Sequence, residues 1–141
     1  MNYLIDTCVI SELVKDSPDA NVLEYINNLI DSDVMISVIT IGELKNGISN
    51  LAKGKRRSKL EKWLNEEMLV RFDGRILNID TDIMLVWGEL VSTLSSVGRP
   101  MPIMDSLLAA QCKRYELKLI TRNTKDFDNT GIKLINPWQL D

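Results

Sequence analysis

The sequence contains no histidine, and this absence excludes several kinds of active site. Ser-His-Asp and Cys-His catalysis both need an imidazole as they are usually built, and so do zinc sites that include histidine. A Cys-x-x-Cys pair is also missing, because the only two cysteines are Cys8 and Cys112. Any metal ion must therefore be held by oxygen ligands, which favours Mg²⁺ or Mn²⁺.

Other patterns that define large protein classes are missing as well. No apolar run approaches the ~20 residues that a membrane-spanning helix needs, and the N-terminus lacks the features of a signal peptide. Two cysteines in apolar surroundings favour buried thiols in a reducing cytosol over a disulfide framework. Neither a Walker A pattern nor GxGxxG is present, which disfavours a nucleotide-binding protein. We therefore expect a cytoplasmic protein without a membrane partner.

The composition is that of an ordinary globular chain. It has 141 residues, of which 45% are hydrophobic and 26% are charged. These values argue against disorder, and the length suits one packed core. No low-complexity tract, repeat or linker interrupts the chain, so residues 1–141 are predicted to form a single domain.

Strand and helix patterns alternate along the chain. The strand segments are apolar without polar alternation, which is typical of a parallel sheet covered on both faces. The pattern predicts a three-layer α/β/α sandwich around a mainly parallel sheet of about five strands. Strands are expected at about 2–6, 33–38, 75–79, 118–121 and 133–135, and helices at about 8–15, 18–31, 40 to the break at Gly54, 55–72, 81–97 and onward from 103.

Four acids fall where these elements begin or end. Asp6 closes the first strand, Glu43 lies in the first turn of the helix expected after the second, Asp105 lies in the first turn after Pro102, and Asp126 follows the fourth strand. In a parallel sheet, strand ends and the following helix starts share one edge, and ligands bind at that edge. Carboxylates gathered in one cleft repel each other unless a cation neutralises them. A divalent ion would do so and would also be a catalyst.

Each acid also has a purely structural interpretation. Thr40 and Glu43 match a capping box, in which Glu43 only returns to the Thr40 amide. Asp105 could complement the positive end of its helix, and Asp126 could be a solvated loop acid. Asp6 is the hardest to explain in this way, because an acid after a buried strand needs a partner.

Charge is distributed unevenly. The formal net charge is −3, yet residues 53–62 (KGKRRSKLEK) carry a local +5, which leaves −8 on the rest. A basic segment on an acidic body can bind a phosphate backbone locally, because counterion release depends on local contacts. Lys55, Arg56 and Arg57 are the candidate backbone contacts, and a solvated helix face is the alternative.

Several segments together resemble a known family. The segments LIDTCVISEL, TIGEL, MDSLLAA and LITRNTKDFDNTGIKLINPW, in this order, are similar to those of PIN-domain ribonucleases. Within that family they resemble VapC-type toxins of type II toxin–antitoxin pairs, including the FitB-like branch. The resemblance runs from Asn2 to Trp138.

The resemblance implies an endoribonuclease that depends on Mg²⁺, with Mn²⁺ as a substitute, and that a cognate antitoxin neutralises. Asp6 and Asp105 match direct metal ligands, and Glu43 and Asp126 match supporting acids. It also implies a homodimer and a higher assembly with the antitoxin. Polar positions that line such sites are matched by four further residues: Thr7, Ser11, Thr121 and Asn123.

Two other functions are compatible with parts of the pattern. A phosphatase of the haloacid-dehalogenase type also has a strand-end Asp and Mg²⁺, but it usually has a second acid two residues later, where this chain has Cys8. A non-catalytic module that binds RNA or protein is the other alternative, and it predicts no metal-dependent turnover.

Overall fold

The computed structural model describes residues 2–140 and contains a five-stranded, all-parallel sheet with the strand order β3-β2-β1-β4-β5. The expectation of a mainly parallel sheet with flanking helices is confirmed. β1 is the central strand, and its residue Leu4 pairs with Met35 of β2 on one side and Leu119 of β4 on the other. The strands are β1 (Tyr3–Ile5), β2 (Val34–Ser37), β3 (Ile76–Leu77), β4 (Lys118–Ile120) and β5 (Leu134–Ile135).

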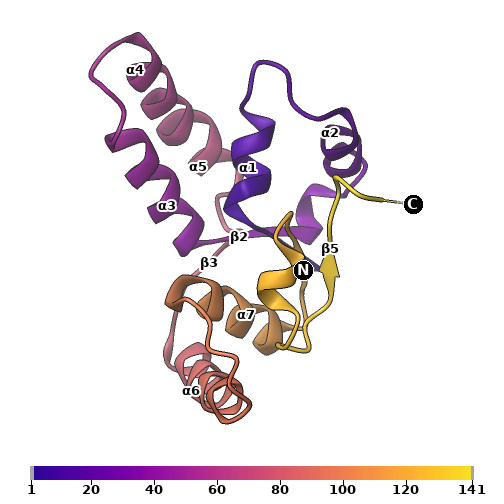
Figure 1. Ribbon diagram of the computed structural model, residues 1–141. Helices are drawn as coiled ribbons and strands as arrows, with labels where there is room; N and C mark the ends of the chain where they lie inside the picture. The colour runs from indigo at the N-terminus through magenta and orange to yellow at the C-terminus, as the bar shows by residue number, and fades with distance from the viewer. Residues whose placement is uncertain (1, 141) are drawn as a thin grey trace.

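Helices connect these strands and cover both faces of the sheet (Figure 1). The apolar residues of the strands pack into two separate cores, one on each face. Helices α1, α2 and η2 contribute to the core that contains Ile5 and Ile36, whereas α6 and α7 contribute to the core that contains Leu4 and Met35. The helical segments are α1 (Thr7–Leu13), α2 (Ala20–Asn27), η1 (Asp31–Asp33), α3 (Val38–Ser49), α4 (Lys55–Lys62), η2 (Trp63–Met68), α5 (Leu69–Arg71), α6 (Thr81–Ser96), α7 (Ile103–Tyr115) and η3 (Thr124–Phe127).

Three helix boundaries differ from the sequence prediction. The second helix was expected at 18–31, but α2 starts after its N-cap Asp19 and ends at Asn27, because consecutive asparagines compete with the helical backbone hydrogen bonds. The helix expected at 55–72 is interrupted by the π-helical turn η2. The helix expected from residue 40 begins at Val38, because the Ser37 hydroxyl accepts from the Ile39 amide and caps it.

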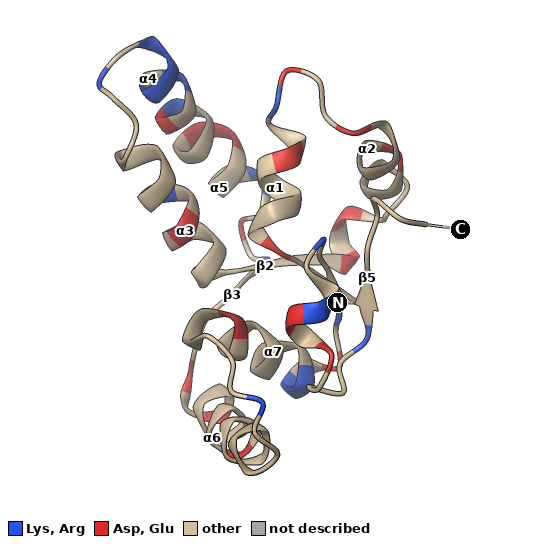
Figure 2. Ribbon diagram, viewed as in Figure 1, with Lys and Arg blue, Asp and Glu red and all other residues tan. Residues whose placement is uncertain are grey.

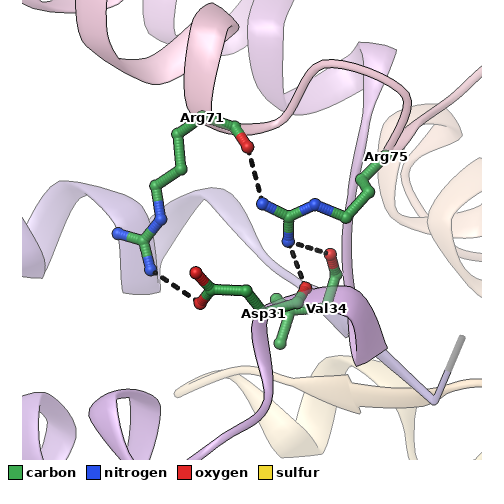
Figure 3. A network of polar contacts seen from close by, with 4 residues as sticks. All are labelled: Asp31, Val34, Arg71 and Arg75. Carbon is green, nitrogen blue, oxygen red and sulfur yellow. Dashed lines mark hydrogen bonds and ion pairs between the residues drawn. The ribbon is translucent and has the colours of Figure 1, made fainter.

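Hydrogen bonds of Arg75 link the start of β2 to the segment that precedes β3. Its guanidinium donates to the carbonyls of Asp31, Val34 (2.9 Å) and Arg71 (2.6 Å), and its carbon Cζ lies 4.7 Å from the centre of the Phe72 ring (Figure 3). Arg71 forms an exposed ion pair with Asp31 at 3.5 Å. Arg75 thus satisfies carbonyls of three segments and holds the part of the sheet formed by β2 and β3 in place.

Two side-chain contacts hold α7 over its face of the sheet. The amide nitrogen of the buried Gln111 donates to the carbonyls of Leu77 and Asn78, each at 3.2 Å. The Trp87 indole donates to the Ser106 hydroxyl at 2.9 Å and thereby joins α6 to α7. Within the described residues, no helix is long and apolar enough to cross a membrane.

The strand order reverses direction between β1 and β4. The chain runs outward from β1 to β2 and β3, then returns across the sheet to β4 and β5. In open α/β sheets this reversal of direction is where ligands bind, because the connections leave the sheet on opposite faces. Asp6 and Thr121 are the residues that directly follow β1 and β4 at this point.

Candidate active site

Asp6 is buried, with 7% of its surface exposed, and local donors hold its carboxylate in one orientation. It is the N-cap of α1, and its Oδ1 accepts from the Thr7 amide at 2.8 Å. Its Oδ2 accepts from the Thr121 hydroxyl at 2.8 Å, which joins the carboxyl ends of β1 and β4. The Thr121 hydroxyl in turn accepts from the Asn123 amide at 3.0 Å. The strand-end acid therefore has the partners that its burial requires.

Glu43 is connected to Asp6 through Thr7. The Thr7 hydroxyl donates to Glu43 Oε1 at 2.6 Å and lies 3.0 Å from the hydroxyl of the buried Thr40. Because Ser37 caps α3, Glu43 lies in the second turn of that helix, and the expectation of the first turn was wrong. The capping-box interpretation is wrong for the same reason. The i, i+3 spacing of Thr40 and Glu43 instead directs both side chains at Thr7.

Asp105 lies in the first turn of α7 and is only partly exposed. Burial, together with the charges of Asp6, Asp126 and Glu43, raises the pKa of its carboxyl to about 6. All three of the other predicted acids thus act on Asp105, as expected if the four share one edge of the sheet. Burial and the charge of Asp6 also raise the pKa of the Cys112 thiol, which lies further along α7, to about 12.

Asp126 is exposed on η3, the short helix after β4. The Asp126 amide donates to the Asn123 carbonyl at 3.0 Å. The buried Phe127 anchors the segment in the core that contains Leu4 and Met35. This local structure keeps Asp126 on the side of the sheet where Thr121 supports Asp6.

The four acids are chemically suited to a hard divalent cation, since all their ligand atoms are carboxylate oxygens. The mutual repulsion that acts on Asp105 is the kind that a cation relieves. Among residues 2–140, no three acidic or cysteine side chains lie close enough to surround an ion in their present orientations. Coordination would therefore bring these side chains closer together.

Cys8 was expected to be a buried thiol, but it is only partly buried and contacts the site. Its thiol lies 3.8 Å from Asp6 Oδ2 and 3.7 Å from the Thr121 hydroxyl, and the sulfur accepts from the Arg122 amide at 3.5 Å. Burial, followed by the charge of Asp6, raises the pKa of this thiol. The contact of Cys8 with the site could have been predicted from its position two residues after Asp6. Cys112 is buried as expected.

The remaining predicted residues lie apart from these contacts. Ser11 is exposed on α1 and, within residues 2–140, makes no hydrogen bond to any of the four acids. Arg57 is partly buried, pairs with Glu61 at 2.9 Å and donates to the Leu51 carbonyl. Lys55 and Arg56 are exposed on α4, where basic side chains gather at the tip of the α3–α4 hairpin (Figure 2). Their contact with RNA stays a prediction.

Comparison with known proteins decides the family. The sequence matches the PIN domain over residues 3–133, which is most of the chain. The chain belongs to the PIN-domain family. This PIN domain is 33% identical over 135 residues to Toxin FitB of Neisseria gonorrhoeae, covering 96% of this chain and 97% of the relative. It is also 33% identical over 136 residues to VapC ribonuclease Y4jK of Sinorhizobium fredii, with coverage of 96% and 97%.

Solved structures agree with this assignment. The PIN domain superimposes on the crystal structure of FitAcB from Neisseria gonorrhoeae with a TM-score of 0.93, at 33% identity and coverage of 98% of this chain and 99% of the other. A structure of FitAB bound to the IR36 DNA fragment gives the same TM-score at 31% identity, with coverage of 99% and 97%. The VapC-type resemblance of the sequence is confirmed, and membership in this family replaces the phosphatase alternative.

Proposed function

We propose that this PIN domain, residues 1–141 acting as one unit, is the metal-dependent endoribonuclease of a toxin–antitoxin pair. The observation that carries the proposal is the convergence of three acids on Asp105 at the carboxyl edge of the sheet. Relatives named as ribonucleases over nearly the same length support it. The free thiols of Cys8 and Cys112 are consistent with a cytoplasmic site of action.

Asp6 and Asp105 would hold a Mg²⁺ ion directly, with Glu43 and Asp126 in support; Mn²⁺ could replace it. Such an ion, when bound, polarises a phosphodiester oxygen and makes deprotonation of an attacking water easier. The protein's own residues fix the geometry. Thr7 and Thr121 hold the two carboxylate oxygens of Asp6 at 2.8 Å each, and the Thr7 hydroxyl holds Glu43. These contacts hold Asp6 and Glu43 before an ion binds, which reduces the reorientation that coordination requires.

Replacing Asp6 with Asn tests the proposal, because the amide oxygen can still cap α1 but the charge is lost. We expect Asp6→Asn to abolish Mg²⁺-dependent cleavage of RNA and to weaken Mn²⁺ binding measured by electron paramagnetic resonance. The matched control is Asp73→Asn, an exposed acid in the turn before β3. A folded Asp6→Asn protein that degraded RNA at the wild-type rate would contradict the assignment.

A cavity lined by apolar and charged side chains, the latter from Asp31, Glu67, Arg71 and Arg75, supports the proposal of an antitoxin partner. It has a volume of about 170 Å³, lies between α1, α2 and η2, and is lined by side chains that include Ile10, Leu13, Ile26, Trp63 and Met68. Because a relative at 33% identity is named Toxin FitB, we propose that a side chain of a cognate antitoxin fills this cavity. Leu13→Glu should then prevent rescue by the co-expressed antitoxin and leave RNA cleavage intact.

Exposed apolar side chains on α6 and at the start of α7 support the proposal of a homodimer. Met84, Leu85, Ile103 and Met104 are 42–66% exposed there, and an exposed apolar patch of this kind marks an interface. Leu85→Asp should convert the dimer to a monomer in size-exclusion chromatography with light scattering. Val70→Asp, which is equally exposed on α5, is the matched control.

A further inference from the structure

A groove lies at the carboxyl ends of β4 and β5, and one of the four acids, Asp126, lines it. Its volume is about 590 Å³, which is within the range of ~300–1,000 Å³ of pockets that hold ligands of nucleotide size. One wall is the segment that follows β4, and the other is the segment that follows β5. Its lining includes Arg122, Asn123, Lys125, Asp126, Asn136 and Trp138. The Arg122 amide donates to the Cys8 sulfur, and that sulfur lies 3.8 Å from Asp6 Oδ2, so the groove adjoins the candidate active site.

An aromatic ring and a guanidinium form a stacked pair in this groove. Arg122 Cζ lies 5.1 Å from the centre of the Trp138 ring. Trp138 is partly buried against the core that contains Ile5 and Ile36. Arg122 is exposed, so its guanidinium forms the outer layer of the pair. Such planar groups bind unpaired bases by stacking, because every base offers a π-face.

Asn136 holds the two halves of the stacked pair together. Its Oδ1 accepts from the Trp138 amide at 2.9 Å, and its Nδ2 donates to the Arg122 carbonyl at 3.4 Å. The Gln139 amide donates to the Asn136 carbonyl at 3.1 Å and closes the turn around the buried Pro137. The pair is thus preorganised by hydrogen bonds between the two walls of the groove.

Charge in the groove also suits a nucleic-acid strand. Arg122 and Lys125 are both exposed, and neither forms an ion pair with a carboxylate in the part of the chain that the structure describes. Lys125 can therefore contact a phosphate, and the Arg122 guanidinium of the stacked pair adds positive charge next to the base. The basic residues of α4 lie instead at the tip of the α3–α4 hairpin (Figure 2).

We propose that this groove binds one unpaired nucleotide of a single-stranded RNA next to the phosphodiester that is cut. The base stacks on the Arg122–Trp138 pair, and Lys125 contacts the neighbouring phosphate. The location beside the cut rests on the proposed ribonuclease function, whereas the binding of the nucleotide rests on the groove itself. The groove then selects for a strand that is unpaired at this position.

Binding of a fluorescein-labelled RNA decamer, measured by anisotropy in EDTA so that no cleavage occurs, tests the proposal. Arg122→Gln and Lys125→Gln should each lower the slope of log Kd against log salt by about one. Trp138→Leu should weaken binding about tenfold or more, and Trp138→Phe should largely retain it. Lys133→Gln removes the same charge just before β5, at the amino end of the strand whose carboxyl end borders the groove, and should change neither affinity nor salt slope. A fully paired RNA of the same sequence should not respond to the Trp138 variants.

Arg122→Gln is the decisive variant, because Arg122 is exposed and its removal leaves the core intact. Unchanged affinity and salt slope in folded Arg122→Gln and Trp138→Phe/Arg122→Gln proteins would overturn the proposal. Cleavage by the wild type in Mg²⁺ is measured alongside. Binding that depends on the groove without any cleavage would support the groove and refute the ribonuclease. Cleavage by Arg122→Gln with the same KM as the wild type would support the ribonuclease and refute the groove.

Discussion

The partly exposed Asp105 should destabilise the protein in the absence of divalent cations, and Asp105→Asn should relieve this. Burial and three neighbouring acids raise the pKa of Asp105 from 3.8 to about 6, so its charged form is penalised in the folded state. The unfolded chain has no such penalty. An uncharged amide of nearly the same shape removes the repulsion and keeps the packing at the start of α7.

The structure allows the size of this effect to be worked out. At about 1.36 kcal/mol per pH unit, a pKa rise from 3.8 to about 6 corresponds to about 3 kcal/mol. The carboxyl is partly exposed, and solvent screening reduces the expected gain to about 1 kcal/mol. For a chain of this length that is an increase of about 3 °C in Tm.

The gain should depend on pH in a defined direction. Below pH 3.8 the carboxyl is protonated in both the folded and the unfolded chain, and the penalty is absent. As pH rises from 3.8 to about 6, the folded protein loses stability relative to the Asn variant, and above pH 6 the difference is complete. Thermal melts in EDTA at pH 4 and pH 7.5 should therefore give nearly equal Tm values at the lower pH and a higher Tm for Asp105→Asn at the higher pH.

Added Mg²⁺ provides the second half of the assay. It should raise the Tm of the wild type by binding the folded state, and it should raise the Tm of Asp105→Asn far less. The reasoning is refuted if the Asn variant melts below the wild type at pH 7.5 in EDTA, or if the difference between the two is the same at both pH values.

Three further predictions follow from contacts described above. Thr121→Val removes the hydroxyl that donates to the buried Asp6 carboxylate and should lower the free energy of unfolding in urea by about 1–3 kcal/mol, with Thr121→Ser close to wild type; equal urea midpoints for Val and wild type would contradict this. Arg75→Met loses three carbonyl contacts and the contact of the guanidinium with the Phe72 ring. Guanidinium denaturation should therefore show a loss of about 2 kcal/mol, whereas RNA cleavage should not change. If α4 contacts the RNA backbone, neutralising Lys55 and Arg56 should lower the salt slope of RNA binding by about two, and an unchanged slope would exclude that role. Arg57→Gln should instead lower the stability of α4 by about 0.3–0.5 kcal/mol, because Arg57 already pairs with Glu61.

The layered fold was predictable because the apolar strand segments lack polar alternation, and only a sheet covered on both faces buries such segments. The strand lengths were less so. β3 and β5 have only two residues each. A residue counts as part of a strand only where a neighbouring strand pairs with it, whereas the apolar pattern in the sequence extends past the paired residues. The interruption of the 55–72 helix by η2 likewise depends on packing of Leu64 and Met68 against the core, which local propensity does not encode.

Glu43 illustrates what sequence pattern alone leaves open at the site. Thr40 and Glu43 have the spacing of a capping box, and the local sequence does not exclude it. The outcome depends on Thr7, 36 residues earlier, whose hydroxyl takes up Glu43, and on Ser37, which already caps the helix. The Arg122–Trp138 pair was equally hidden, because it forms only when the loops after β4 and β5 meet.

The position of β1 between β2 and β4 has a consequence for synthesis of the protein. Asp6 is synthesised well before Thr121, whose hydroxyl orients it from a position 115 residues later. β4 must also arrive before the central strand gains its second neighbour. Domains fold as units during translation, so a nascent or prematurely terminated chain that lacks β4 has its acids but not their arrangement. The arrangement of these acids is therefore complete only after β4 has been synthesised and has paired with β1.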